Sequence, residues 1–297
     1  MFGLLNINKP AGLTSRQVVN QVQRIVRPAK VGHAGTLDPM ATGVLIVCVG
    51  PATKLISFVQ QQAKVYRSEF VFGQTSDTDD STGHVLDVID PEPFTREQLE
   101  DVLPGFVGEI SQTPPQFSAV KVGGQRAYKL ARQGQTVEIQ AKTVRIDRLD
   151  VLGFEYPRLE LEIECGSGTY IRSIARDLGR LLGCGAVMSR LERTRIGECS
   201  VDDALSLNDL SPETLTDALL PPTVATRELP SFTATDTQCE RLRNGQWLSL
   251  EPQADWVENT PIAVHSTTGQ LVCLANFRQR DRSLAPKQVF PVMEGGE

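Results

Sequence analysis

The chain of 297 residues is 40% hydrophobic and 22% charged, and its net charge of −6 weighs against a nucleic acid partner unless basic side chains are segregated. Length and composition fit one large globular domain, or a large and a small one. No apolar run is long enough to span a bilayer, and Met1 to Lys9 lack the pattern of a secretory signal, so we expect a cytoplasmic protein without membrane contact.

The six cysteines are dispersed along the chain, with no Cys-x-x-Cys pair, and there are only three histidines. This spacing is typical neither of a zinc site nor of a disulfide framework. We expect the cysteines to be reduced thiols in the core, and the sequence indicates no metal site.

The first predicted helix begins after Thr14, which forms a capping-box pattern with Gln17 ahead of apolar residues at helical spacing. A loop from Gly32 to Gly43 follows, with three glycines in unusual backbone positions. Its only carboxylate, Asp38, precedes a proline and is therefore pushed into extended geometry. A buried strand over Val44–Val49 would give the loop a rigid base. Asp38 either presents a carboxylate for chemistry or merely starts an Asp-Pro turn.

Two elements are predicted next: a helix over Ala52–Gln62 and a strand over Val65–Gly73. Alternation places Tyr66, Phe70 and Phe72 on one face of this strand. On that pattern alone, Tyr66 is an ordinary core tyrosine.

The acidic segment Asp77–Gly83 invites a calcium-loop interpretation, which fails because its glycine falls one place late and the twelfth position is Val88 rather than Glu. Thr95 and Gln98 then form a second capping-box pattern and open a short helix.

The segment Gln112–Lys142 carries proline and glycine pairs together with a local net charge of +4. We predict a projecting arm rather than part of the core. A locally basic surface on an acidic protein is compatible with binding of a polyanion, although each basic cluster could also be an ordinary solvated face. The cations of this arm are Lys121, Arg126, Lys129, Arg132 and Lys142.

Leu159 to Cys165 alternates apolar residues with glutamates and predicts a half-buried strand whose acidic face is solvated. A helix with an apolar stripe follows, for which Thr169 is the predicted N-cap. Arg172 then lies in the first turn, where the helix dipole disfavours a cation by about 0.3–1 kcal/mol. Such a cation needs an anion, and Asp38 is a candidate; the alternative is a surface arginine pointing into water.

Prolines between residues 211 and 231 indicate a domain boundary. Beyond it, extended runs at Ile262–His265 and Leu271–Phe277 predict a small β-rich module. This module carries a second basic cluster with a net charge of +3, formed by Arg278, Arg280, Arg282 and Lys287 against Asp281.

Taken together, these motifs resemble those of the TruB family of pseudouridine synthases, in the family's order and over roughly residues 4 to 195. The motifs are Gly32–Gly43, Asn8–Ser15, Lys64–Arg67, Gly73-Gln74 with Asp77–Asp79, Gln112–Pro115 with Ser118–Lys121, and Gly168–Arg172. One departure is Glu192-Arg193, where paired arginines are often seen, and it concerns a local phosphate contact rather than the reaction.

The resemblance implies an isomerase that converts uridine 55 in the T loop of tRNA to pseudouridine after flipping the base, with no metal or organic cofactor. Asp38 would be the catalytic carboxylate, attacking C1′ or removing the C2′ proton, and Arg172 would pair with it and keep it ionised. Tyr66 would stack on the uracil and could accept the C5 proton. The remaining roles are implied less specifically: His33 would occupy the space of the flipped base, Tyr170 and Leu191 would line the pocket, and Lys9 would support it or contact phosphate.

The resemblance also implies an α+β fold with a mixed, largely antiparallel sheet flanked by helices. We expect a catalytic domain over residues 1–225, with 112–142 as its RNA-binding arm, and a small PUA-like RNA-binding module over 230–293. The expected partner is the tRNA T stem-loop, bound by a monomer without an obligatory protein partner. Two alternatives remain: a guide-RNA-dependent synthase subunit, disfavoured by the arm and by the lack of a long basic tail, and a tRNA-folding chaperone with secondary catalysis.

Overall fold

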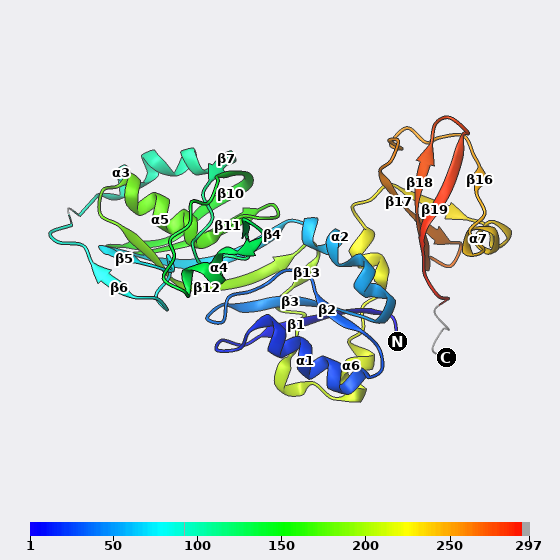
Figure 1. Ribbon diagram of the computed structural model, residues 1–297, viewed down its shortest axis with the longest axis horizontal. Coiled ribbons are helices and arrows are strands. Elements are labelled where there is room, and N and C mark those ends of the chain that lie inside the picture. The colour runs from blue at the N-terminus through cyan, green and yellow to red at the C-terminus, as the bar shows by residue number, and fades with distance from the viewer. Residues whose placement is uncertain (92, 293–297) are drawn as a thin grey trace.

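The computed structural model describes residues 1–91 and 93–292, so Met293, the predicted end of the C-terminal module, lies outside the described residues. Two sheets dominate the chain, and Figure 1 shows the C-terminal sheet set apart from the rest. None of the described helices combines the length and the apolar character needed to cross a membrane.

The main sheet has ten strands within the described residues and runs through the whole N-terminal part. In spatial order its path is β14 (Leu205–Ser206), β1 (Gly3–Lys9), β3 (Thr42–Val49), β12 (Ala186–Ile196), β4 (Lys64–Phe72), β11 (Arg158–Cys165), β10 (Lys142–Glu155) and β7 (Gly108–Gln112). Off this path, β2 (Val31–His33) pairs with β3, and β13 (Cys199–Ser200) pairs with β12.

Two strand pairs, β1–β14 and β3–β12, are parallel, and the other pairs are antiparallel, so the predicted mixed, largely antiparallel sheet is confirmed. The parallel contact of β12 with β3 is short, and it joins the strands of two lobes that Figure 1 shows side by side. The site described below lies near this junction.

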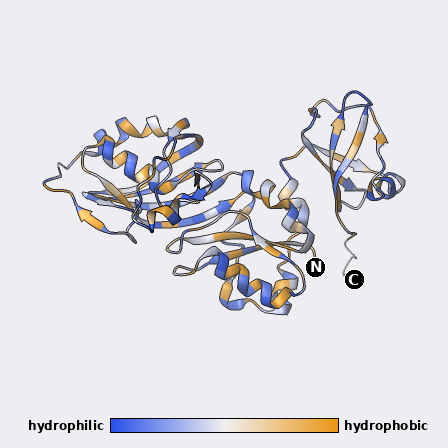
Figure 2. Ribbon diagram, viewed as in Figure 1, coloured by the Kyte–Doolittle hydropathy of each residue, from blue (hydrophilic) through white to orange (hydrophobic). Residues whose placement is uncertain are grey.

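The helices cover this sheet through amphipathic faces, and Figure 2 shows hydrophobic and hydrophilic stretches alternating along α1 and α5. The α-helices are α1 (Ser15–Val26), α2 (Ile56–Gln61), α3 (Arg96–Val102), α4 (Ala127–Ala131), α5 (Ile171–Leu181), α6 (Pro212–Asp217) and α7 (Asp236–Arg243). Short 3-10 helices are η1 (Gly50–Leu55), η2 (Leu103–Phe106), η3 (Leu207–Asp209) and η4 (Pro222–Thr226).

The capping boxes predicted at Thr14 and Thr95 are both formed, and they fix the starts of α1 and α3. The helix predicted over Ala52–Gln62 is present, but η1 occupies its first part and only Ile56–Gln61 is α-helical. A 3-10 turn at the N-terminus of an α-helix is common, and an apolar pattern does not distinguish the two types over so short a segment.

The predicted arm leaves the sheet at Gln112 and returns at Lys142, two residues that are paired in neighbouring strands. It contains β8 (Lys121–Val122), β9 (Gln125–Arg126) and α4. Most of its side chains are exposed, but Ser118 and Ala127 are buried, so the arm also packs back onto the body of the protein. A small separate hairpin, β5 (Gln74–Ser76) with β6 (Val85–Asp87), follows β4.

The C-terminal sheet confirms the predicted β-rich character, with both predicted runs inside strands. Its order is β15 (Ser231–Ala234), β17 (Pro261–Ser266), β18 (Leu271–Arg278), β19 (Ser283–Val289) and β16 (Leu248–Ser249). It has a core of its own around Trp256 and Phe277. It also shares a hydrophobic cluster with the N-terminal part, in which the rings of Phe2 and Phe290 stack 5.4 Å apart.

Candidate active site

A cavity of about 430 Å³ lies where the Asp38 loop, the strands β4 and β12, the arm and the start of α5 meet. Five of the seven predicted site residues line it: Asp38, Tyr66, Tyr170, Arg172 and Leu191. Lys9 and His33 do not line it. Asp38 and Leu191, 153 positions apart in the chain, are thus brought together only by the fold, as expected for a site built on several elements.

Lys9 lies fully buried beneath the Asp38 loop. Its Nζ donates hydrogen bonds to the carbonyl oxygens of Pro10 at 2.8 Å, Leu13 at 2.7 Å and Pro39 at 3.3 Å. Burial lowers its pKa to about 8, although the nearby carboxylate of Asp38 acts in the opposite direction. This geometry favours support of the loop over the contact with phosphate that was the alternative.

The loop is held on the other side of Asp38 as well. The backbone N–H of Leu37 donates to Ser15 Oγ at 2.8 Å, and Ser15 Oγ donates back to the Leu37 carbonyl at 3.2 Å. The residues on both sides of Asp38, Leu37 and Pro39, are therefore tied to β1 and the start of α1. Such hydrogen bonds limit the positions that the carboxylate can take.

Asp38 forms the predicted ion pair with Arg172. The Nε atom of Arg172 lies 3.0 Å from Oδ2 of Asp38, and Nη2 donates to Oδ1 at 3.3 Å. The arginine side chain is only 7% exposed, whereas that of Asp38 is 32% exposed and reaches the cavity. A planar guanidinium bound through two nitrogens fixes the direction of a carboxylate as well as its charge.

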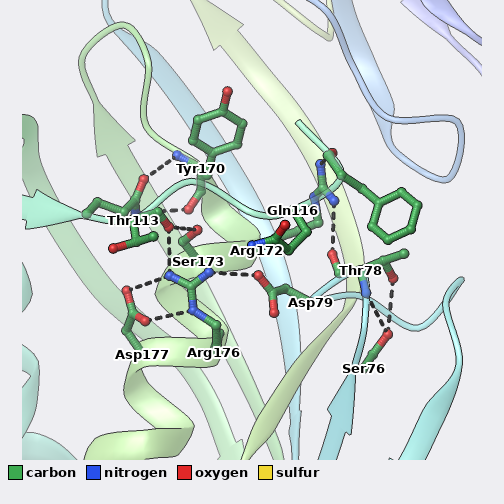
Figure 3. Close-up of polar contacts among 12 residues, drawn as sticks. Ser76, Thr78, Asp79, Thr113, Gln116, Tyr170, Arg172, Ser173, Arg176 and Asp177 are labelled. Atoms are coloured by element: carbon green, nitrogen blue, oxygen red, sulfur yellow. Dashed lines mark hydrogen bonds and ion pairs between the residues drawn. The ribbon is translucent and has the colours of Figure 1, made fainter. Parts of the chain in front are cut away.

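Arg172 is fixed in turn by backbone carbonyls from two other segments. Nη1 donates to the Thr78 carbonyl at 2.9 Å, a bond drawn in Figure 3, and Nη2 donates to the Phe117 carbonyl at 3.2 Å. The second of these acceptors belongs to the arm. The arm therefore contributes directly to the position of the Asp38–Arg172 pair.

The N-cap of α5 is Tyr170 and not the predicted Thr169. Thr169 Oγ1 donates to the Gly166 carbonyl, while the backbone N–H of Tyr170 donates to Gln112 Oε1 at 2.8 Å. A side chain from β7 thus satisfies a backbone donor at the helix start, and local sequence does not reveal such a distant partner. Arg172 remains in the first turn, as predicted.

Sequence reasoning missed a second carboxylate, Asp80, in the segment rejected as a calcium loop. Asp80 is 3% exposed, and its Oδ2 lies 3.6 Å from Nη1 of Arg172. Its Oδ1 accepts hydrogen bonds from Thr78 Oγ1 and from the N–H and Oγ1 of Thr82. The sequence contains no signal that distinguishes this inward-facing aspartate from its acidic neighbours.

A neighbouring network ties the arm to α5 (Figure 3). Arg176 Nη1 donates to Asp79 Oδ2 at 2.9 Å, and its Nη2 donates to the Thr113 carbonyl at 2.7 Å. Ser173 Oγ donates to the same carbonyl at 2.9 Å. The start of the arm is therefore bound to the helix that carries Arg172.

Burial raises the pKa of Asp38 above that of an ordinary aspartate, and this effect outweighs the opposing effect of Arg172. The negative charge of Asp80 acts in the same direction as burial. Arg172 thus favours the ionised form of Asp38, as predicted. Burial and the charge of Asp80 have the opposite effect and make the carboxylate of Asp38 more basic than it would be with the ion pair alone. A more basic carboxylate is a better nucleophile or proton acceptor.

Tyr66 lies on β4, and its ring packs against the hydrophobic cluster under α5. The same side chain also lines the cavity, so Tyr66 is both a core residue and part of the cavity wall. Burial raises the pKa of its phenol, whereas a hydrogen bond and the charge of Arg193 act to lower it. Arg193, directly opposite Tyr66 in the register of β12, also lines the cavity and was not among the predicted site residues.

Lys64 is a further cavity residue that sequence reasoning did not assign to the site. Its Nζ donates to the carbonyl oxygens of Gln60 and Gln62, and burial lowers its pKa to about 8. Its position two residues before Tyr66, on the same face of the strand, is the one signal that could have suggested it.

His33 lies on β2, which pairs with β3, behind the Asp38 loop. Its Nδ1 atom is buried and has no hydrogen-bond partner among the described residues. Burial lowers the pKa of the ring, which therefore stays neutral at physiological pH.

The described part of the chain contains no group of three or more His, Cys, Asp or Glu side chains placed to hold a metal ion. All six cysteines are free and buried, as predicted from their dispersion. The arrangement in the cavity is one carboxylate, oriented by a guanidinium and facing an aromatic ring, which suits acid–base or nucleophilic chemistry on a planar substrate.

The fold also occurs in solved structures of other proteins. Two solved structures resemble the chain over almost its whole length. A chain of an H/ACA RNP bound to a substrate RNA containing 2′-deoxyuridine has a TM-score of 0.75 and 23% identity, over 98% of this chain and 86% of that one. A chain of a Cbf5-Nop10-Gar1 complex has a TM-score of 0.74 and 25% identity, over 99% of this chain and 84% of that one.

Family models identify the protein family. The N-terminal domain of TruB family pseudouridylate synthases matches residues 23–171, and the C-terminal domain of tRNA pseudouridylate synthase B matches residues 172–223. Among curated relatives, a tRNA pseudouridine synthase B of Dehalococcoides mccartyi is 43% identical over 98% of this chain and 97% of its own. One of Mycobacteroides abscessus is 41% identical over 95% of each. The chain belongs to the TruB family of pseudouridylate synthases, and it is an isomerase.

Proposed function

We propose that this isomerase acts on tRNA and converts uridine 55 of the T loop to pseudouridine. The observation that carries the proposal is the Asp38–Arg172 pair at a cavity walled by Tyr66. The names of the curated relatives, tRNA pseudouridine synthase B, support tRNA as the substrate class.

In the proposed reaction the uridine is flipped out of the T loop, at a cost of a few kcal/mol, and enters the cavity. Asp38 then attacks C1′ or removes the C2′ proton, and the N1–C1′ bond breaks. The detached uracil turns and C5 bonds to C1′. In the first route the bond between Asp38 and C1′ breaks at this step, and in the second route Asp38 returns the proton to C2′. The C5 proton is then lost and N1 gains a proton. Both routes need an ionised Asp38 held in one direction, which the ion pair with Arg172 supports.

Tyr66 would stack on the uracil, while Tyr170 and Leu191 would line the rest of the pocket. Acceptance of the C5 proton by Tyr66 remains part of the proposal, although burial disfavours its phenolate. His33 would contribute outside the cavity, at the position that the flipped base leaves. Lys9 would act through the loop that it supports.

The five cations of the arm are exposed, and no ion pair of the described residues involves them. In contrast, the arginines on the outer strands of the main sheet, such as Arg148 and Arg158, are paired with glutamates. Cations without a carboxylate partner can neutralise phosphates, and the arm also contributes Phe117, Ser118 and Ala119 to the cavity wall, so the arm is the proposed surface for the T stem.

The proposed organisation is a catalytic domain over residues 1–225, with 112–142 as the arm, and a PUA-like RNA-binding module over 230–293. The enzyme would act as a monomer without another protein, in the cytoplasm, where tRNA is its substrate. The second candidate, a subunit of a guide-RNA-dependent synthase, is favoured by one observation, the resemblance to chains from H/ACA RNP and Cbf5 complexes. A tRNA-folding role could accompany either activity.

The test is incubation of the purified protein alone with an unmodified tRNA transcript, followed by mapping of pseudouridine. We expect modification at uridine 55 without guide RNA, and none in a matched transcript with cytidine at that position. Product only after addition of a guide RNA would favour the second candidate, and tRNA refolding without product would favour the chaperone.

A further inference from the structure

Arg193 is a buried cation without a carboxylate partner. Its side chain is among the largest in the fully buried core, with the residue only 2% exposed. Among the ion pairs of the described residues, none involves Arg193. Two positions further along the same strand, Arg195 is 46% exposed and lies 3.1 Å from a carboxylate oxygen of Glu164. The unpaired state is therefore specific to Arg193 and not a property of the strand.

The guanidinium of Arg193 bonds only to neutral groups. Nε donates to the Val44 carbonyl at 2.8 Å, Nη2 donates to the Gly35 carbonyl at 3.2 Å, and a further bond goes to Tyr66. These bonds engage Nε and Nη2 but leave the positive charge of Arg193 uncompensated, which is costly in a buried position. An anion entering the cavity would lower that cost.

The charge of Arg193 reaches the cavity that it lines. It contributes to lowering the pKa values of four cavity or loop groups: those of Lys9, His33, Lys64 and Tyr66. The charge of Arg172, in contrast, is already neutralised by two carboxylates, those of Asp38 and Asp80. Of these two cavity arginines, only Arg193 is thus available to act on a new negative charge.

The proposed reaction, on which this inference rests, creates such a charge. When the N1–C1′ bond breaks, its electron pair stays on the uracil, and the negative charge spreads over N1 and the carbonyl oxygens. The charge disappears when C5 bonds to C1′ and a proton is finally transferred from C5 to N1. We propose that Arg193 stabilises the detached uracil anion while Tyr66 holds its ring. Preorganised charge in a site shielded from water is effective because nothing has to reorient when the bond breaks.

The experiment compares single-turnover rates of Arg193→Gln, Arg193→Lys and the wild type on T stem-loop RNA containing uridine or 5-fluorouridine at the target position. Disappearance of the starting nucleotide is the readout. Fluorine withdraws electrons and stabilises the uracil anion without help from the protein. Arg195→Gln, which removes the same charge from the surface of the same strand, is the matched control. Thermal unfolding and RNA affinity of each variant report on the fold and on binding.

We expect Arg193→Gln to slow turnover of the uridine RNA by about 100-fold, the size of effect known for loss of one oxyanion donor. The loss should be clearly smaller on the 5-fluorouridine RNA, and Arg193→Lys should retain more of the rate than the glutamine variant. Arg195→Gln should match the wild type. Equal losses on both RNAs would assign Arg193 a purely structural role and overturn the proposal.

If Arg193→Gln does not fold, the lysine variant decides. Lysine keeps the positive charge but not the forked hydrogen bonds. Its single-turnover rate should therefore fall by a similar factor on both RNAs, and by less than about 100-fold, because only the positioning of the charge is impaired. A lysine variant that folds and loses as much as about 1,000-fold would overturn the proposal. Failure of the wild type to convert uridine would instead contradict the proposed function, a result distinct from either outcome.

Discussion

Arg172 holds two carboxylates at once: Asp38 at Nε, 3.0 Å away, and Asp80 at Nη1, 3.6 Å away. Asp80 does not line the cavity and is almost completely buried. It therefore influences the reaction through the guanidinium that orients Asp38 and through the effect of its charge on the pKa of Asp38.

We expect Asp80→Asn to reduce the single-turnover rate by about 10-fold or more, because loss of one charge from a buried network alters the position of the shared arginine. The affinity for tRNA should change little, since Asp80 is outside the cavity. Asp87→Asn, in which the substituted carboxylate is exposed on β6, is the control. A wild-type rate in Asp80→Asn would show that Arg172 keeps its position without Asp80.

Asp38→Asn should abolish the product while leaving tRNA binding largely intact. The amide has nearly the same shape, but it can neither attack C1′ nor take the C2′ proton. Pseudouridine mapping and a filter-binding titration with the same transcript measure the two properties. Normal turnover in this variant would remove Asp38 from the chemistry.

The rate should fall on the acid side through the pKa of Asp38, because only the ionised carboxylate reacts. Burial raises this pKa, so the fall should begin at a higher pH than for an ordinary aspartate. Arg172→Met removes the charge that opposes burial and should move the midpoint to still higher pH.

Single-turnover rates across the acid range locate the midpoint. In a variant that is too slow, the carboxyl carbon resonance of Asp38 reports the same ionisation. Arg67→Met, which removes an exposed arginine next to Tyr66, should leave the midpoint in place. An unchanged midpoint in Arg172→Met would mean that the ion pair has little influence on Asp38.

Gly179→Ala should displace α5 from the sheet. A Cβ atom at this position would lie 2.2 Å from the backbone nitrogen of Ala186, so the helix has to move, at a cost of about 1–3 kcal/mol. Because Arg172 is on the same helix, the rate should fall together with the free energy of unfolding in urea. Gly105→Ala, where a Cβ meets no atom within 4 Å, is the control. Unchanged urea unfolding would contradict the close approach of α5 to β12.

Local patterns in the sequence predicted the elements well where short-range chemistry decides them. Thr14 and Thr95 start helices because their side chains bond within three residues, and the alternation from Leu159 to Cys165 gives the half-buried strand β11. Even the Asp38–Arg172 pair was predictable, because a cation in the first turn of a helix needs an anion.

The residues that were missed depend on contacts between distant segments. Asp80 is one of several acidic residues in its loop, and only its contact with α5 distinguishes it. Arg193 resembles the other arginines of β12, and its burial follows from the parallel pairing of β12 with β3. Tyr170 replaced Thr169 as N-cap because Gln112 supplies the acceptor from another strand. Spacing along the chain does not encode such long-range geometry.

The stacking of Phe2 on Phe290 has a consequence for the synthesis of the protein. Phe2 is made 288 residues before its partner ring. At about 5–20 residues per second, this side of the N-terminal strand stays uncovered for about 15–60 s. The nascent chain therefore exposes an aromatic surface until Phe290 is made, and a chain released before Phe290 never covers it.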